Sequence, residues 1–318
     1  MIEKIPKNIS DILNSNPIFA IDVGSRGGVS TFGSLEPYIN IIGFEADENE
    51  AARLQGLIQD QRKFRSCSIE SFAVWSKNMK SKLYICKYLP NCSLLQPNID
   101  CAKKFGLADQ FAIVSTKTVP CITLETLLQE RGMPAPDYLK IDAQGGDLEV
   151  LKGLKSFIND VLLIRLEVIF VPLYSHNPTF GEIDQFMRNH SFRLLSVQNK
   201  YPRSIRSRKT INNPVTDNGE FVWADLIYTK DFEFIHPIKY LPMERALSYA
   251  LLLAYEGFNS LAIDLILMIS QKQNFSEDFV ESIISTIIKN SYKIKIRKNI
   301  ATFIPDKIKK YVKRFLHS

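Results

Sequence analysis

Two acidic residues near the start of the chain have the type and the spacing that a nucleoside-binding site requires. Asp22 lies in the apolar run 18–23, and Glu45 ends the apolar run 39–45, which places it 45 − 22 = 23 residues later. In a βαβ unit the turn after the first strand approaches the ligand, and a carboxylate at the end of the second strand accepts hydrogen bonds from ribose hydroxyls. The pattern therefore predicts a nucleoside site at the ends of two neighbouring strands.

The glycines between these acids decide which nucleoside fits. A dinucleotide needs the spacing G-x-G-x-x-G, whereas the glycines here are Gly24, Gly27 and Gly28. The missing phosphate turn argues against a nucleotide-sugar dehydrogenase or epimerase. Asp22 would repel a phosphate and suits a cationic ligand without phosphate, such as S-adenosylmethionine. The predicted cofactor contacts of this block are Asp22, Gly24, Ser25, Gly28 and Glu45.

A second block with chemistry-bearing residues reads LKIDAQGGDLEVLKG from Leu139 to Gly153. Together with the first block it resembles the signature of FkbM-family methyltransferases, over roughly residues 15 to 230. The chain departs from the family at Ala46, where proline is usual, and at Gly146, where an aromatic residue is common. The resemblance implies S-adenosylmethionine as the methyl donor and a Rossmann-like class I methyltransferase fold. Further segments that fall in the family's order are 93–98, 122–127 and 166–168.

Two carboxylates near the ends of later strands are candidates for catalysis. Asp142 follows an apolar strand, at the end where open α/β sheets bind their ligands, and Glu167 lies near the end of the next strand. Methyl transfer from a sulfonium is an in-line displacement that depends on positioning. We therefore expect Asp142 beside the sulfonium or the acceptor and Glu167 at the acceptor. The alternatives are a helix cap for Asp142, a role that Asp147 also fits, and an ion pair with Arg165 for Glu167.

The remaining site residues are assigned from their positions. An alcohol acceptor loses a proton, and histidine is suited to take it near neutral pH, so His176 is expected as a base at the rim of the site. The alternative for His176 is an ordinary surface histidine. Phe72 and Ala73 would wall the adenine or else belong to a core strand. Asp142 and Glu167 could share a divalent cation, but no third ligand accompanies them, and no metal site is predicted.

The succession of apolar runs predicts the elements that hold these residues. Strands are expected at residues 18–23, 39–45, 68–75, 82–88, 138–142, 161–168, 192–198 and 222–229. Helices are expected at 30–38, 48–59, 123–131, 180–189, 243–255, 260–271 and 277–288, with an irregular loop at 91–110. Alternating strands and helices predict a doubly wound, mostly parallel sheet, to which the resemblance adds an antiparallel edge strand. We predict a methyltransferase domain at 1–235 and a small helical appendage at 236–318.

The composition narrows the class of protein. The five cysteines form no C-x-x-C pair and residues 1–17 contain no apolar signal core, which predicts reduced thiols in a cytoplasmic protein. Nine Lys or Arg and one Asp at residues 291–318 give +8, so the rest of the chain carries 6 − 8 = −2. The main domain is therefore not expected to bind nucleic acid. Charged and polar residues interrupt the apolar stretch 247–268, which predicts a helix pair rather than a membrane span.

Two basic segments bear on the acceptor. The loop with Arg203, Arg206, Arg208 and Lys209 is either solvated or, if it folds over the pocket, favours a phosphorylated or lipid-linked acceptor. The basic amphipathic tail 305–318 either packs on the domain or lies on the inner face of an anionic membrane.

The leading prediction is transfer of a methyl group from S-adenosylmethionine to a hydroxyl of a sugar, a glycan or a secondary metabolite. The alternative is a non-catalytic module that binds a glycan or a partner. The presence of Asp22, Gly24, Glu45 and Asp142 together argues against this alternative, because a binding module has no need of a complete nucleoside site.

Overall fold

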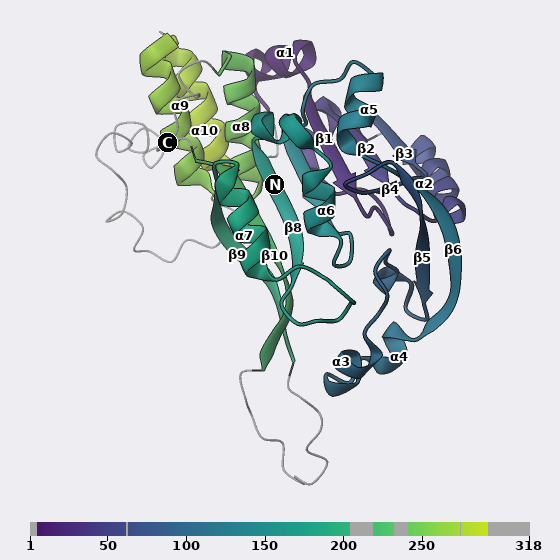
Figure 1. Cartoon of the computed structure of the whole chain (residues 1–318). Helices are drawn as coiled ribbons and strands as arrows, with labels where there is room; N and C mark the ends of the chain where they lie inside the picture. Colours follow the sequence, from purple (N-terminus) through teal and green to yellow (C-terminus); the bar gives the residue numbers. More distant parts are fainter. Residues whose placement is uncertain (1–4, 62, 204–218, 232–240, 274, 292–318) are drawn as a thin grey trace.

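A seven-stranded sheet forms the centre of the molecule (Figure 1). The structure is a computed structural model, and it describes residues 5–61, 63–203, 219–231, 241–273 and 275–291. In spatial order the strands are β3 (Ser66–Glu70), β2 (Ile39–Phe44), β1 (Ile18–Val23), β7 (Tyr138–Ile141), β8 (Leu163–Ile169), β10 (Glu220–Lys230) and β9 (Phe192–Arg203). The first five pair in parallel, and β10 runs antiparallel to both β8 and β9. The expected doubly wound, mostly parallel sheet with an antiparallel edge is confirmed.

Helices cover both faces of this sheet. The α-helices are α1 (Lys7–Ser15), α2 (Glu48–Gln61), α3 (Ile99–Lys104), α4 (Ala108–Phe111), α5 (Leu124–Glu130), α6 (Asp147–Lys152), α7 (Phe180–Asn189), α8 (Met243–Tyr255), α9 (Asn259–Gln273) and α10 (Glu277–Ser291). The 3₁₀ helices are η1 (Gly33–Tyr38), η2 (Leu89–Asn91) and η3 (Lys155–Asp160). Ile18 and Ala20 of β1 pack in one core with α1, α8, α9 and α10, whereas Ile21 and Val23 pack in the other with α5, α6 and α7. The alternation of side chains along a strand explains this division.

The three C-terminal helices share their core with the central sheet. In Figure 1, α8, α9 and α10 (green to yellow) stand beside α1 (purple). Leu247 of α8, Leu265 of α9 and Ile283 of α10 are all completely buried in the core that also contains Ile18. The division of the chain at residue 235 remains a prediction.

A small second sheet changes one prediction. Its strands, in spatial order, are β4 (Ala73–Val74), β6 (Ile113–Ile122) and β5 (Met79–Cys86). The expected strand 68–75 is therefore wrong as a single element, because β3 pairs with β2 in the main sheet and β4 pairs with β6. The chain leaves the main sheet between Glu70 and Ala73, and this change of sheet carries Phe72 and Ala73 toward the end of β2.

The helix expected at residues 30–38 is also corrected. Only the 3₁₀ helix η1 forms there, and it contains Pro37, which has no backbone N–H. Side chains bind the backbone before it: Asp22 Oδ2 accepts the N–H of Ser30, and Glu36 Oε1 accepts those of Phe32 and Gly33. An α-helix leaves its first four N–H groups unpaired, so these bonds cap the start of the segment. The α-helix itself is interrupted by Gly33, whose φ is +60°, and by Pro37. The expected loop 91–110 likewise contains two short helices, α3 and α4.

The predicted caps have different outcomes. The helix expected at 123–131 is capped by Thr123, whose hydroxyl accepts the N–H of Thr126 at 3.0 Å. The cap predicted at Asp147 is wrong: Gly146 is the N-cap residue, and Asp147 is the first residue of α6. Asp147 Oδ1 instead accepts the N–H of Ala143 from the preceding turn at 3.2 Å. The acid therefore orders the turn that follows Asp142 rather than the helix itself.

Some predictions fall on other parts of the chain. The basic tail 305–318 and the basic residues Arg206, Arg208 and Lys209 lie outside the described residues. Among the residues that the structure describes, no helix combines the length and the apolar composition needed to cross a membrane. The apolar stretch 247–268 forms parts of two packed helices, α8 and α9, as predicted.

Candidate functional site

The two sequence blocks meet directly at the ends of β1 and β7. These strands are neighbours, with Asp22 beside Lys140, and the N–H of Asp142 donates to the carbonyl oxygen of Val23 at 2.9 Å. Gly24 follows with a φ of +81°, and a Cβ at this position would collide with the carbonyl of Asp142. The turn therefore needs glycine both for its backbone angle and for the close approach of the second block.

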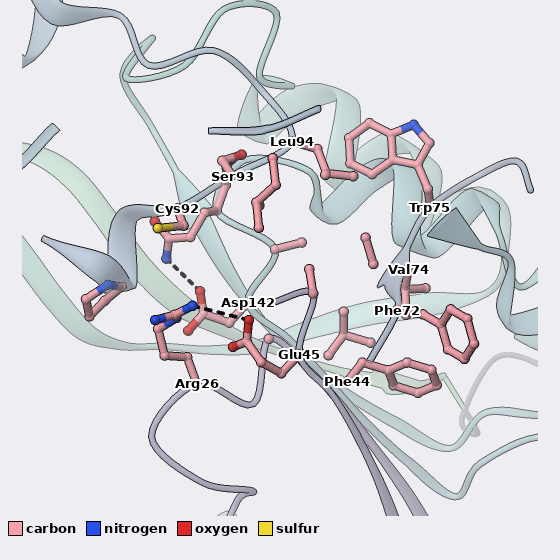
Figure 2. Close-up of a pocket in the computed structure, with 18 of the residues that line it drawn as sticks. Arg26, Phe44, Glu45, Phe72, Val74, Trp75, Cys92, Ser93, Leu94 and Asp142 are labelled. Atoms are coloured by element: carbon pink, nitrogen blue, oxygen red, sulfur yellow. Dashed lines mark hydrogen bonds and ion pairs between the residues drawn. The ribbon is translucent and has the colours of Figure 1, made fainter. Parts of the chain in front are cut away.

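A pocket opens where β1, β2 and β7 end. Five of the predicted residues line it: Gly24, Glu45, Phe72, Ala73 and Asp142. Figure 2 shows Glu45 and Asp142 near one another, with Phe72 and Trp75 further along the pocket. Open α/β sheets bind ligands at this end of their strands. The combination of acids with an apolar and aromatic wall matches the polar ribose and the flat adenine of a nucleoside.

Glu45 is the buried acid of this pocket. Its Oε1 accepts the backbone N–H of Asp47 at 2.8 Å and Nη2 of Arg26 at 3.4 Å. Oε2 receives no hydrogen bond from the residues that the structure describes, which leaves this oxygen for a ligand. Burial raises the pKa of Glu45, although the N–H of Asp47 and the charge of Arg26 act in the opposite direction. A carboxylate oxygen accepts hydrogen bonds, so Oε2 fits the hydroxyls of a ribose, which donate them.

Three predicted cofactor residues lie behind the turn and do not line this pocket. Asp22 is almost fully buried, its Oδ2 accepts both the N–H and the hydroxyl of Ser30 at 2.7 Å, and its Oδ1 lies 3.2 Å from Nζ of Lys140. Ser25 donates its hydroxyl to the carbonyl of Asp22. Gly28 lines a different cavity on the far side of the turn. These residues shape the turn, and direct contact with a cofactor remains a prediction for them.

Gln144 joins the two candidate catalytic acids. Its Nε2 donates to Oδ1 of Asp142 at 2.7 Å and to Oε1 of Glu167 at 3.0 Å. The hydroxyl of buried Tyr174 lies 2.9 Å from both Oε1 of Gln144 and the carbonyl oxygen of Asn91, and its one proton is donated to one of them at a time. Burial, together with the carboxylates of Asp142 and Asp147, raises the pKa of Glu167 well above its usual range. The structure therefore brings Asp142 and Glu167 together, as expected.

The neighbouring cations pair with other acids. Nζ of Lys140 lies 3.2 Å from Asp22 and 3.7 Å from Asp142. Arg165, the alternative partner expected for Glu167, instead lies 2.6 Å from Asp225 and 3.6 Å from Glu256. Glu167 consequently has no ion pair among those that the described residues make. Within these residues no group of three or more His, Cys, Asp or Glu side chains is arranged to hold a metal ion.

The structure does not bring His176 into this group. His176 is exposed in the loop between β8 and α7, with a φ of +63°, and it does not line the pocket. Its role as a base remains a prediction without a contact to support it. His190 is the C-cap residue of α7, where its Nδ1 lies 2.8 Å from the carbonyl oxygen of Phe186.

Sequence reasoning missed three side chains of the site. The first is Arg26 of the glycine turn, which lies 3.4 Å from Glu45, the acid that follows β2. Its signal in the sequence is a cation three residues after Val23. Gln144 was part of the second block, and no role was given to it. Trp75 packs against Gly146, where a Cβ would collide with its indole ring. Trp75 thus takes the space beside the position at which the family commonly has an aromatic residue.

The strand order, the antiparallel edge and the nucleoside-type pocket define the class of this protein, a Rossmann-like class I methyltransferase. A sequence model of the methyltransferase FkbM domain matches residues 28–194, which is 194 − 28 + 1 = 167 of 318 residues. The chain belongs to the FkbM family of methyltransferases, and this family implies S-adenosylmethionine as its cofactor.

Several solved structures are similar to the chain at low identity. Methyltransferase FkbM from Methylobacillus flagellatus KT is 10% identical with a TM-score of 0.38, over 67% of this chain and 43% of that chain. Magnesium protoporphyrin IX methyltransferase from Synechocystis PCC 6803 is 9% identical with a TM-score of 0.32, over 71% of this chain and 79% of that one. TrmK from M. capricolum is 8% identical with a TM-score of 0.33, over 90% and 96%. The chain therefore spans less than half of the first of these, and comparison with curated proteins finds no match.

Proposed function

We propose that this methyltransferase acts on oxygen and methylates a hydroxyl of a sugar, a glycan or a secondary metabolite. The observation that carries the proposal is the pair of carboxylates Asp142 and Glu167, which Gln144 bridges at the pocket. A hydroxyl becomes a good nucleophile when its proton is removed, and a base works best when its pKa lies near the working pH. Burial and the neighbouring carboxylates raise the pKa of Glu167, which makes it a stronger base than an ordinary carboxylate.

Different residues of the pocket would bind different parts of the cofactor. Glu45 would hold the ribose hydroxyls through its free oxygen, and Phe72 and Trp75 would wall the adenine. Gly24 keeps the turn close to Asp142, so that the methionine part can approach both. When bound, S-adenosylmethionine supplies an electrophilic methyl group.

Asp142 and Glu167 would act on the acceptor, with Glu167 as the base that removes its proton. One oxygen of Glu167 is held by the amide of Gln144, and the other is left to accept the proton of an acceptor hydroxyl. The two carboxylates keep the N–H groups of Gln144 pointed at them, because both accept hydrogen bonds from its Nε2. Ser93 donates its hydroxyl to the carbonyl oxygen of Gln144 at 2.8 Å and closes this side of the site.

The cofactor part is tested with Glu45→Gln. Removing the charge of a buried acid that accepts hydrogen bonds costs on the order of 2 kcal/mol, so binding of S-adenosylhomocysteine in calorimetry should weaken by more than about tenfold. Glu48→Gln is the matched control, because it removes the same charge from an exposed position three residues later. Equal affinity of the two variants would contradict the assignment of Glu45.

The reaction part is tested with Glu167→Gln. S-adenosylhomocysteine should still bind, whereas its production in the presence of hydroxyl compounds should fall by about 10²-fold or more, the loss typical of a missing general base. The methylated product should carry its new methyl group on oxygen, which nuclear magnetic resonance identifies. A methyl group on nitrogen or carbon, or full turnover of the variant, would refute O-methylation through Glu167.

A further inference from the structure

A second cavity, of about 450 Å³, shares Asp142 with the nucleoside pocket. Strands β7, β8, β9 and β10 form its wall together with the loop after β1 and the end of α8. The part of the wall contributed by Asn199, Trp223, Asp225 and Tyr255 lies outside residues 28–194, the segment that matches the family. This part of the cavity therefore depends on residues that follow the matched segment.

The register of the strands places three carboxylates in one row along the cavity. Glu167 of β8 lies opposite Asp225 of β10, and Ile141 of β7 lies opposite Leu166 of β8, so Asp142 follows beside Glu167. The row begins at the nucleoside pocket with Asp142 and ends with Asp225 on β10, the strand next to the edge strand β9. A molecule in the cavity would reach the base Glu167 from the side opposite the nucleoside pocket.

The cations of the cavity wall are already neutralised. Arg165 lies between Asp225 at 2.6 Å and Glu256 at 3.6 Å, and Glu256 is itself fixed by the hydroxyl of Tyr138 at 2.6 Å. Lys140 lies between Asp22 and Asp142. Among the described residues that line the cavity, no other side chain is a cation. A phosphate or carboxylate on the acceptor would therefore find no unpaired positive charge here.

The groups that remain available are acceptors of hydrogen bonds. Arg165 and Asn199 both donate to Oδ2 of Asp225, and Gln144 donates to Oε1 of Glu167. The other oxygen of each acid receives no hydrogen bond within the part of the chain that the structure describes. Hydroxyl groups donate to such oxygens, whereas an anion is repelled by them.

An aromatic surface completes the wall. Trp223 lines the cavity and stacks on Tyr201, with 3.9 Å between the ring centroids and 10° between the planes. The stack holds the indole in one orientation. A flat apolar surface beside hydrogen-bonding acids fits a ring that has C–H groups on its face and hydroxyls on its edge.

We propose that this cavity is the acceptor site and that it takes an uncharged, polyhydroxylated ring, a sugar unit without phosphate or carboxylate at the end that is methylated. The proposal rests on the proposed function, because it places such a ring hydroxyl at Glu167. It assigns the choice of acceptor to Asn199, Trp223 and Asp225, with Arg165 held away from the ligand by its two acids.

The experiment compares matched acceptors with the full chain and S-adenosylmethionine. The probes are methyl glycosides of common hexoses and the corresponding hexose 6-phosphates, together with simple alcohols, and the readout is the rate at which S-adenosylhomocysteine forms. We expect kcat/KM to be at least tenfold higher for the neutral glycoside than for its phosphate. In Asp225→Asn, Arg165 loses its closest countercharge, and the preference over the phosphate should fall by about tenfold.

Two further variants keep this result interpretable. Glu220→Gln removes a charge from an exposed position on the same strand and should leave the preference unchanged. Asn199→Asp adds a charge at the cavity and should strengthen the preference for the neutral sugar. Calorimetry with S-adenosylhomocysteine shows whether each variant retains the folded cofactor site.

The outcomes separate this inference from the proposed function. A higher rate with the phosphate, or the same preference in all variants, would overturn the inference and leave O-methylation in place. Transfer to simple alcohols without transfer to any neutral sugar would also overturn the inference and leave O-methylation in place. Absence of transfer to every hydroxyl compound, although S-adenosylhomocysteine binds, would overturn both.

Discussion

The contact between the two sequence blocks predicts a large effect of one methyl group at Gly24. In Gly24→Ala the new Cβ would lie 2.9 Å from the carbonyl carbon of Asp142 and closer still to its oxygen. The residue would also keep a φ of +81°, which L-residues rarely adopt. Gly27 is a matched control, because its φ is +89° and a Cβ there meets no atom within 4 Å.

The two costs can be estimated separately. A positive φ in an L-residue costs roughly 1–2 kcal/mol, and this term applies to Gly24→Ala and Gly27→Ala alike. The collision with Asp142 adds an overpacking cost of about 1–3 kcal/mol, because a backbone carbonyl between paired strands moves less easily than a side chain. We therefore expect Gly24→Ala to lose about 2–5 kcal/mol of unfolding free energy and Gly27→Ala about 1–2 kcal/mol.

Urea unfolding measures this difference, provided that the slope of free energy against urea is the same for all three proteins. Gly24→Ala should also bind S-adenosylhomocysteine more weakly than Gly27→Ala does, since any displacement of Asp142 alters the pocket. If the two variants had the same free energy of unfolding, the contact between Gly24 and the carbonyl of Asp142 would not affect stability, and the reasoning would be refuted.

Three other predictions concern individual side chains. Burial raises the pKa of Glu167 in the folded protein above its ordinary value of 4.5. Glu167 therefore stabilises the fold most at low pH, and this stabilisation is lost as the pH rises through the raised pKa. The variant Glu167→Gln should melt at a higher temperature than the wild type at pH 8 and at nearly the same temperature at pH 4. Asp142→Asn should lower kcat and kcat/KM together by more than about tenfold and should change the affinity for S-adenosylhomocysteine less. A residue that acts only as a helix cap would not give this pattern. Thr179→Ala removes the capping box of α7 and should cost about 1 kcal/mol in urea unfolding without changing cofactor affinity; an unchanged midpoint would contradict it.

Much of the fold could be predicted because its signals are local. The buried strand at 18–23 is a continuous apolar run, and α7 was expected with the bounds Phe180–Asn189 that the structure has. The errors occurred where single residues or distant contacts override the periodic pattern. Gly33 takes a φ of +60° and Pro37 has no N–H, so the helix expected at residues 30–38 shortens to η1. No pattern within residues 68–75 shows that β4 pairs with β6, nearly fifty residues later.

The candidate site divides in the same way. The sequence by itself determined the glycine turn, the acid Glu45 at the end of β2 and the acid Asp142 at the end of β7, because strand ends and turns are encoded by neighbouring residues. Only the tertiary structure decided that Gln144 bridges Asp142 to Glu167 and that Arg165 turns to Asp225 and Glu256. These pairings depend on strand register and on the packing of α8, which join residues far apart in the chain and therefore leave no local signal in it.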